Sequence, residues 1–468
     1  MPSAAEPATN TATAIAILRQ RLGERLQTGT AIRQQHANTL TWLANLPADA
    51  VAFAESHEEV VEIVKICAAH RVPVVPFGAG TSLEGQVNAP HGGISLDLSR
   101  LNRILTVNHA DLDVEVEAGV TRQALNEHLR DSGLFFPVDP GAGHATLGGM
   151  ASTRASGTTA VRYGTMKDIV LNVTAVLADG TSLRTARRAR KSAAGYDLTR
   201  LMVGAEGTLG VITSLTVRVF GIPESIVAAV CPFATLEGAC NTVIQAIQLG
   251  LGLARVELLD ELQVRACNGY AKMTLDETPT LFIEVHGSAA GTREQVETFR
   301  AIAACEGALR FDVADKPEDR NRLWQARHDV YWASKSLRPG AEALATDVCV
   351  PISRLAECVT QTKADIARFG LIAPIVGHVG DGNFHVQPLV DMTDPDEVAR
   401  VQEFIEVLAA RAIAMDGTCT GEHGVGMGKI KYLRAEHGAG VDVMARIKQA
   451  LDPFGILNPG KIIGPGKD

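Results

Sequence analysis

Short β-type runs alternate with glycine-rich segments through the first half of this chain, and no other feature constrains its fold as strongly. One run reads Val114-Glu115-Val116-Glu117, an alternation of apolar and polar residues that is typical of a strand with one buried face. Asp179-Gly180 separates two further runs and predicts a hairpin turn. Helical periodicity at 56–70 and 121–132 lies between the runs, so we expect an α+β fold. The predicted strands are 72–75, 94–98, 114–118, 169–177 and 211–219.

Turn-forming residues at Gly221-Ile222-Pro223 predict a domain boundary, and strand-like and helix-like segments alternate again beyond it. Before residue 45 the chain is polar and Ala-rich, with one helical piece near 15–26. We therefore expect a helical arm at 1–44, an α+β domain at 45–222 and a second α+β domain at 223–468. In the second domain the predicted strands are 226–231, 254–259, 281–285 and 309–313, and the predicted helices are 236–249, 293–305, 321–336, 353–368, 394–415 and 440–451.

The composition predicts a folded globular protein without a role in nucleic-acid binding. A chain of 468 residues that is 46% hydrophobic and 21% charged can bury a sizeable core. Its formal net charge is −9 and only 4% of its residues are aromatic. A general nucleic-acid binder needs a basic surface and aromatic stacking platforms, and this chain offers neither.

We predict neither a membrane span nor a signal peptide. The most apolar uncharged stretch, 238–254, is interrupted by Asn, Thr and Gln residues, so we interpret it as an amphipathic helix. The first thirty residues lack a short apolar core that ends in a small-residue cleavage site. We expect a cytoplasmic location, with peripheral attachment to the inner face of a membrane left open.

Eight scattered cysteines form no CxxC pair, which argues against a disulfide framework, a zinc knuckle and an iron–sulfur centre. We expect most of them to be small buried hydrophobic residues in a reducing compartment.

Residues 76–85, Pro-Phe-Gly-Ala-Gly-Thr-Ser-Leu-Glu-Gly, form the first of three segments rich in Gly, Ser and Thr. Glycine allows a loop to turn its backbone N–H groups toward an anion, and Thr81 and Ser82 can donate two more hydrogen bonds. The segment departs from the GxGxxG fingerprint at Leu83, which disfavours a Rossmann site for NAD. Taken alone, it is equally consistent with a glycine-rich surface turn.

Two more such segments, 141–164 and 204–213, lie in the same predicted domain. Three loops of this kind suit an extended cofactor that carries phosphate. The candidate cofactor-binding residues are Pro76, Gly78, Ala79, Gly80, Thr81, Ser82, Gly148, Gly149, Ser152, Gly157, Glu206, Gly207, Gly210 and Ile212.

This set of loops resembles the flavin-binding domain of the vanillyl-alcohol oxidase and p-cresol methylhydroxylase superfamily. The resemblance implies FAD, with its pyrophosphate on these loops and Asn458 approaching the flavin from the C-terminal tail. Some members attach the flavin to a histidine. Because His91 and His144 lie in no matching context, we expect non-covalent FAD.

A second constellation lies in the C-terminal half. His378 and His385 stand seven residues apart around a Gly-Asp-Gly turn, and Glu422-His423 follow on another glycine-rich segment, 418–429. Two histidines and one carboxylate make an open site for a divalent ion such as Zn²⁺, Mn²⁺ or Fe²⁺, with positions left for substrate oxygens. The alternative is a hydrogen-bonded core cluster.

The C-terminal half resembles the FAD-linked oxidase C-terminal domain, and its pattern is most similar to the cytochrome-linked, FAD-dependent D-lactate dehydrogenase family. The similarity lies in 323–328, 346–353, 451–461 and the two segments that carry the histidines. It implies oxidation of D-lactate to pyruvate, with hydride transfer to flavin N5. Electrons would then pass to a cytochrome, a quinone or an electron-transfer flavoprotein.

The resemblance also implies roles for individual residues. His423 would be the base. Arg327 is the candidate clamp for the substrate carboxylate because a guanidinium presents two parallel donors that match a carboxylate, with Arg338 as the reserve candidate. His378, His385 and Glu422 would hold the ion, and Asn383 would support the metal loop.

Substrate choice within the family stays open among D-lactate, glycolate and D-2-hydroxyglutarate. Ala345-Thr346-Asp347 stands where D-2-hydroxyglutarate dehydrogenases have Lys-Tyr-Asp, which argues against a second substrate carboxylate. Two other classes also remain open: a metal-dependent hydrolase without flavin, and a flavin subunit that acts only within a larger glycolate-oxidising complex. A homodimer is equally open.

Overall fold

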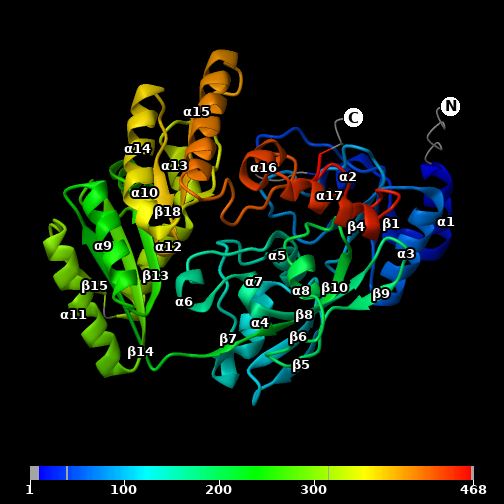
Figure 1. The fold of residues 1–468 in the computed structure, drawn as a ribbon, viewed down its shortest axis with the longest axis horizontal. Coiled ribbons are helices and arrows are strands. Elements are labelled where there is room, and N and C mark those ends of the chain that lie inside the picture. Colours follow the sequence, from blue (N-terminus) through cyan, green and yellow to red (C-terminus); the bar gives the residue numbers. More distant parts are fainter. Residues whose placement is uncertain (1–9, 38–40, 315, 465–468) are drawn as a thin grey trace.

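The computed structural model describes residues 10–37, 41–314 and 316–464 of the chain. These residues form two lobes, with the first and last parts of the chain together in one lobe and the middle of the chain in the other (Figure 1). Residues 1–9 and 38–40 of the predicted helical arm lie outside the described ranges.

A four-stranded sheet of order β1-β2-β4-β3 opens the first lobe. Strands β2, β4 and β3 run parallel, and the crossover between β2 and β3 is α3, whose cap Ser56 accepts the Glu59 backbone N–H at 3.2 Å. The elements are α1 (Thr11–Leu22), η1 (Gly23–Arg25), β1 (Leu26–Gln27), α2 (Thr30–Gln35), β2 (Ala50–Phe53), α3 (His57–His70), β3 (Val74–Phe77) and β4 (Ile94–Asp97).

A five-stranded antiparallel sheet of order β5-β6-β10-β8-β9 completes the first lobe. Asp179 and Gly180 form the turn between β8 and β9, which confirms the predicted hairpin. The strands are β5 (Ile104–Asn108), β6 (Asp113–Glu117), β8 (Val170–Val176), β9 (Ser182–Arg184) and β10 (Val211–Arg218), with the pair β7 (Leu134–Phe135) and β11 (Phe220–Gly221) beside them. The helices are α4 (Arg122–Leu129), η2 (Arg130–Ser132), α5 (Leu147–Thr153), α6 (Ala160–Tyr163), α7 (Met166–Ile169) and α8 (Leu198–Met202).

The second lobe is a seven-stranded sheet of order β15-β12-β14-β13-β18-β19-β17. Its strands are β12 (Ser225–Pro232), β13 (Leu253–Leu259), β14 (Thr280–Gly287), β15 (Asp312–Ala314), β17 (Val348–Cys349), β18 (Ile375–Gly377) and β19 (Asn383–Val386), with the pair β16 (Glu342–Ala343) and β20 (Leu389–Val390) nearby.

Helices cover both faces of this sheet. One face packs on α9 (Leu236–Gln248), α11 (Ala289–Cys305), η3 (Ile352–Arg354), α14 (Leu355–Arg368) and α15 (Pro395–Ala414). The other packs on α10 (Glu261–Ala271), α12 (Pro317–His328) and α13 (Val330–Ser336). The predicted helix 321–336 is therefore two helices, which meet at Asp329.

After the second lobe the chain returns to the first. Helix α16 (Ile430–His437) is followed by α17 (Gly440–Leu451), red in Figure 1, whose Ile447 and Leu451 pack against the core of the first lobe. The Val74 N–H donates to the Ile456 carbonyl at 2.7 Å, and the Asn458 N–H donates to the Val74 carbonyl at 2.8 Å. The predicted second domain, 223–468, includes these residues. Ile456 and Asn458 bond to the first lobe, while α16 contacts α15 of the second lobe.

No described helix combines the length and the apolar composition that a membrane span requires. All eight cysteines are unpaired. Six are buried as predicted, Cys349 is half-buried and Cys305 is exposed.

Candidate functional site

A hollow in the first lobe collects the three predicted glycine-rich loops. Glu422 and His423 reach it from the C-terminal half of the chain. The predicted cofactor residues that line it are Pro76, Gly78, Ala79, Gly80, Thr81, Ser82, Gly148, Gly149, Ser152, Glu206, Gly207, Gly210, Ile212 and Asn458.

Gly157 is the one predicted cofactor residue that does not line the hollow. Its φ is +124°, and a Cβ there would overlap the carbonyl of Asp139. Gly157 therefore permits the close approach of the 139–142 segment, of which Pro140 and Ala142 do line the hollow.

The loops fit a polar ligand that approaches the backbone closely. A Cβ at Gly78 would overlap Thr146 Oγ1, the atom that caps α5 by accepting the Gly149 N–H at 3.3 Å. Ser82 Oγ is buried and has no hydrogen-bond partner within the described residues. Because buried hydroxyls are almost always paired, Ser82 is suited to a group on the bound cofactor.

Glu206 joins this hollow to the segment that carries Glu422 and His423. Its carboxylate accepts the backbone N–H groups of Val425 at 2.6 Å and Gly426 at 2.8 Å. Burial raises the pKa of Glu206 to about 7. Asn458 in turn donates from Nδ2 to the Glu206 carbonyl at 2.7 Å, so the C-terminal tail fixes the same corner of the hollow.

His378, His385 and Glu422 come together as the sequence predicts. His385 lies in β19, and His378 directly follows the neighbouring antiparallel strand β18, so the two histidines face each other across a tight turn. Glu422 Oε1 lies 3.2 Å from Nε2 of each histidine.

Hydrogen bonds fix which nitrogen of each histidine faces Glu422. The Nδ1 atom of His385 lies 2.9 Å from the carbonyl of Thr346, which can only accept, so this Nδ1 carries a proton. The Nδ1 atom of His378 lies 2.7 Å from Glu257 Oε1. Both Nε2 atoms are thereby left as the available ligand atoms, which is the usual arrangement around metal-binding histidines.

Two features of this cluster fit a divalent cation. Glu422 Oε2 is buried and has no hydrogen-bond partner within the described residues. Two imidazole nitrogens and a carboxylate also form the mixed donor set that such ions accept.

The charges of the cluster also suit a cation. Burial disfavours a charged His378, but the carboxylates of Glu257 and Glu422 outweigh burial and raise its pKa to about 10. Burial would likewise raise the pKa of Glu422, but His378 and His385 hold it well below its usual range. His378 therefore carries a proton that a bound metal ion would displace.

His423 places an imidazole between this cluster and the cofactor hollow. Its ring stacks on that of His385, with centroids 5.1 Å apart and an interplanar angle of 5°. Burial, with help from Lys429 and His385, lowers the pKa of His423 to about 4. The imidazole is therefore uncharged near neutral pH, and its buried Nδ1 has no hydrogen-bond partner within the described residues.

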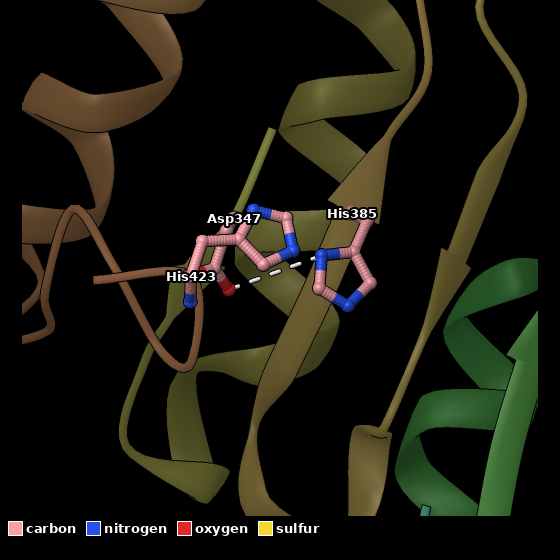
Figure 2. A group of neighbouring side chains, drawn as sticks. All are labelled: Asp347, His385 and His423. Atoms are coloured by element: carbon pink, nitrogen blue, oxygen red, sulfur yellow. Dashed lines mark hydrogen bonds and ion pairs between the residues drawn. The ribbon is translucent and has the colours of Figure 1, made fainter. Parts of the chain in front are cut away.

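Asp347 lies beneath the loop that carries Glu422 and His423, and Figure 2 shows it beside His385 and His423. Its Oδ2 accepts the Thr420 hydroxyl at 2.8 Å and the backbone N–H groups of Glu422 and His423 at 2.9 Å each. Asn383 donates to Oδ1 at 2.7 Å, which gives this predicted supporting residue a defined partner.

The two candidate arginines lie in different surroundings. Arg327 is buried in α12, with Nε and Nη2 each 2.6 Å from Glu257 Oε2. Arg338 pairs with Glu397 of α15, and neither arginine is among the residues that line the cofactor hollow.

Sequence reasoning missed Glu257 as a member of this group and gave Asp347 no role in it. No local signal marks Glu257, because Arg255-Val256-Glu257-Leu258 alternates polar and apolar residues as a strand with one exposed face would.

Comparison with known families identifies the class of protein to which this site belongs. The FAD binding domain family matches residues 48–186, and the family of FAD linked oxidases, C-terminal domain, matches residues 222–462. p-Cresol methylhydroxylase with bound substrate has the same fold, with a TM-score of 0.82, 17% identity, and 98% of each chain covered. The protein is an FAD-linked oxidoreductase with the fold of the vanillyl-alcohol oxidase and p-cresol methylhydroxylase superfamily, as predicted.

Within that class, the chain belongs to the FAD-linked oxidase family that includes the cytochrome-linked D-lactate dehydrogenases. It is 50% identical to "Probable D-lactate dehydrogenase, mitochondrial" of Danio rerio, over 94% of this chain and 89% of that protein. It is 46% identical to "D-lactate dehydrogenase [cytochrome], mitochondrial" of Arabidopsis thaliana, over 92% of this chain and 75% of that protein. The Bacillus subtilis "Glycolate oxidase subunit GlcD" is 34% identical, over 88% of each chain.

Proposed function

We propose that this protein oxidises D-lactate to pyruvate and passes the electrons to an acceptor other than oxygen. The observation that carries the proposal is the position of His423, which lines the cofactor hollow and stacks on His385 of the histidine–carboxylate cluster. The identities of 50% and 46% to proteins named D-lactate dehydrogenase support the choice of substrate.

Oxidation of a 2-hydroxy acid needs a base for the hydroxyl proton, a hydride acceptor at C2 and cationic groups for the carboxylate. Bound FAD supplies the hydride acceptor. His423 is the proposed base, because an imidazole with a pKa near 4 is unprotonated at neutral pH and has a ring nitrogen available for the proton. The hydrogen bond from the His423 backbone to Asp347 holds the base in place.

His378, His385 and Glu422 are the proposed ligands of a divalent ion, with Zn²⁺ or Mn²⁺ as the leading candidates. A bound ion would act as a Lewis acid on the substrate hydroxyl, and this effect is worth several kcal/mol. The chain keeps both Nε2 atoms aimed at one point by tying the Nδ1 atoms to Glu257 and Thr346.

Arg327 is the proposed partner of the substrate carboxylate. Two of its three guanidinium nitrogens already contact Glu257, so Nη1 is the nitrogen left for the substrate. This differs from the two-pronged clamp that the sequence suggested. An ion held by His378, His385 and Glu422 would supply a second positive charge for the carboxylate.

A cytochrome, a quinone or an electron-transfer flavoprotein is the proposed electron acceptor. The word cytochrome in the names of the Arabidopsis thaliana and Saccharomyces cerevisiae relatives favours the first. A cytoplasmic location and a homodimer stay predictions from the sequence, and the relatives just named are called mitochondrial.

Steady-state turnover of the FAD-loaded protein with an artificial dye acceptor tests the substrate. We expect D-lactate to give the highest kcat/KM, with L-lactate inactive and D-2-hydroxyglutarate poor. A preference for glycolate would transfer the proposal to the activity in the name of the Bacillus subtilis relative. Turnover of none of these acids, by a protein that keeps its flavin, would point to a subunit that needs partners.

A further inference from the structure

Glu257 is a buried carboxylate between two functional groups of the proposed site. It lies in β13, and none of its surface is exposed to solvent. Oε1 is 2.7 Å from Nδ1 of His378, and Oε2 is 2.6 Å from both Nε and Nη2 of Arg327. One carboxylate therefore contacts a proposed metal ligand and the proposed substrate-binding arginine at the same time.

Stability of the fold alone does not account for this choice of residue. A buried ion pair pays a desolvation penalty that often cancels its attraction, and an apolar side chain of similar size can serve a core position at least as well. The residues around Glu257 in the sequence, Val256, Leu258 and Leu259, are all apolar and buried. The contacts of Glu257 with His378 and Arg327 explain why a charged residue stands at this position.

We propose that Glu257 is a positioning residue for both the metal site and the substrate carboxylate. Its Oε1 keeps the His378 proton on Nδ1 and so presents Nε2 to the ion. Its Oε2 holds the guanidinium of Arg327 by one edge and leaves Nη1 for the substrate. The inference rests on the proposed function for the identity of the substrate, but the metal-binding part can be tested without turnover.

Replacement of Glu257 by Gln distinguishes a role in positioning His378 and Arg327 from a role in packing alone. The amide has nearly the same shape, but it offers one acceptor and one donor where the carboxylate offers two acceptors. Its NH₂ group must therefore face a donor, either His378 Nδ1–H or the Arg327 guanidinium. Loss of a carboxylate partner behind a metal-binding histidine typically weakens metal affinity by about 10–100-fold.

Glu284 offers a matched control on the neighbouring strand β14. It is also buried, and its Oε1 lies 2.7 Å from Nε2 of a histidine, His286. Its other oxygen accepts the indole N–H of Trp324 at 2.5 Å. Glu284 contacts none of His378, His385 and Glu422, so a Glu284→Gln variant should keep the metal affinity of the wild type.

The experiment is a Zn²⁺ titration of the FAD-loaded protein in competition with a chromophoric chelator, for wild type, Glu257→Gln and Glu284→Gln. Flavin absorbance and the Tm verify that each variant is folded. We expect Zn²⁺ binding to weaken about 10–100-fold in Glu257→Gln and to stay within twofold of wild type in Glu284→Gln. Equal affinity in Glu257→Gln and wild type, or an equal loss in both variants, would overturn the proposal.

A second variant keeps the test decisive. If Glu257→Gln fails to fold, Glu257→Asp takes its place with the same prediction, because the shorter carboxylate cannot reach both partners.

The outcomes separate this inference from the proposed function. Zn²⁺ binding that depends on Glu257, in a protein that does not turn over D-lactate, would leave the positioning role intact and reject the substrate. A wild type that oxidises D-lactate but binds no Zn²⁺ at the cluster would reject the positioning role alone.

Discussion

The carboxylate of Asp347 accepts the backbone N–H of His423 at 2.9 Å, and the same oxygen accepts the backbone N–H of the adjacent Glu422. One buried side chain in the second lobe thus sets the position of the proposed base and of a proposed metal ligand. Lys429 completes the connection, because its ammonium group lies 3.5 Å from Asp347 and 3.2 Å from Glu84 in the first cofactor loop.

Replacement of Asp347 by Asn should reduce kcat about 100-fold while the protein retains its flavin. The amide cannot accept all of the N–H and O–H donors that converge on the carboxylate, and a displacement of about 1 Å at a reacting group can cost that much. Steady-state turnover and flavin absorbance measure the two properties. Asp260→Asn is the control, because Asp260 is buried in the same lobe but pairs with Lys363, away from the cluster. Similar turnover in both variants would show that Asp347 has no special role.

Acid should remove part of the stability that Asp347 contributes. Burial would raise its pKa, but His423, Lys429 and His385 hold it well below the ordinary value of 3.8. Because the folded-state pKa is the lower one, the contribution is fully present above the unfolded-state value and is lost as the pH falls below it. Urea unfolding should therefore show the largest stability difference between wild type and Asp347→Asn above about pH 5, and a smaller difference near pH 3. A difference that grows toward acid pH would contradict this assignment.

Gly78→Ala should lower the FAD content of the purified protein. The new Cβ would overlap Thr146 Oγ1, disturb the cap of α5, which is worth about 1 kcal/mol, and narrow the cofactor hollow. The ratio of flavin to protein absorbance measures the effect. Gly269→Ala is the control, since Gly269 lies exposed in α10 with no atom near the added Cβ. Full flavin content in Gly78→Ala would show that the first loop does not hold the cofactor closely.

Glu422→Ala and His423→Ala should each keep the yellow flavin and lose turnover. Removal of a general base typically costs roughly 100- to 10,000-fold. Loss of Glu422 removes the carboxylate that lies 3.2 Å from both histidines. Turnover with a dye acceptor, measured alongside flavin content, tests both variants. Near-normal turnover in both would reject the proposed site.

The sequence predicts the residues of this site better than it predicts the residues that hold them in place. His378, His385 and Glu422 can be recognised because their chemistry and their glycine-rich neighbours are local in the sequence. The role of Asp347 depends on hydrogen bonds to residues more than seventy positions away, and Glu257 contacts His378 across 121 positions. Such contacts are created by the pairing of strands and the packing of α12, which no local pattern encodes.

The fold divides in the same way into features that the local sequence predicts and features that depend on long-range contacts. The predicted strands and long helices of both lobes are present, because they depend on local periodicity. The return of residues 452–461 to the first lobe is not visible in the sequence, since the Ile456 carbonyl is bonded to Val74, nearly four hundred residues earlier. The break at Asp329, which ends α12 and begins α13, is likewise not visible in the sequence.

The central claim is that FAD and the histidine–carboxylate cluster act on one 2-hydroxy acid. The measurement that tests it most directly is the anaerobic visible spectrum of the FAD-loaded protein after addition of D-lactate or L-lactate, before and after treatment with a chelator. We predict that D-lactate alone bleaches the oxidised flavin band, that chelation abolishes the bleaching, and that added Zn²⁺ or Mn²⁺ restores it. Rapid bleaching by D-lactate after the metal is removed, or no bleaching by either lactate, would contradict the account.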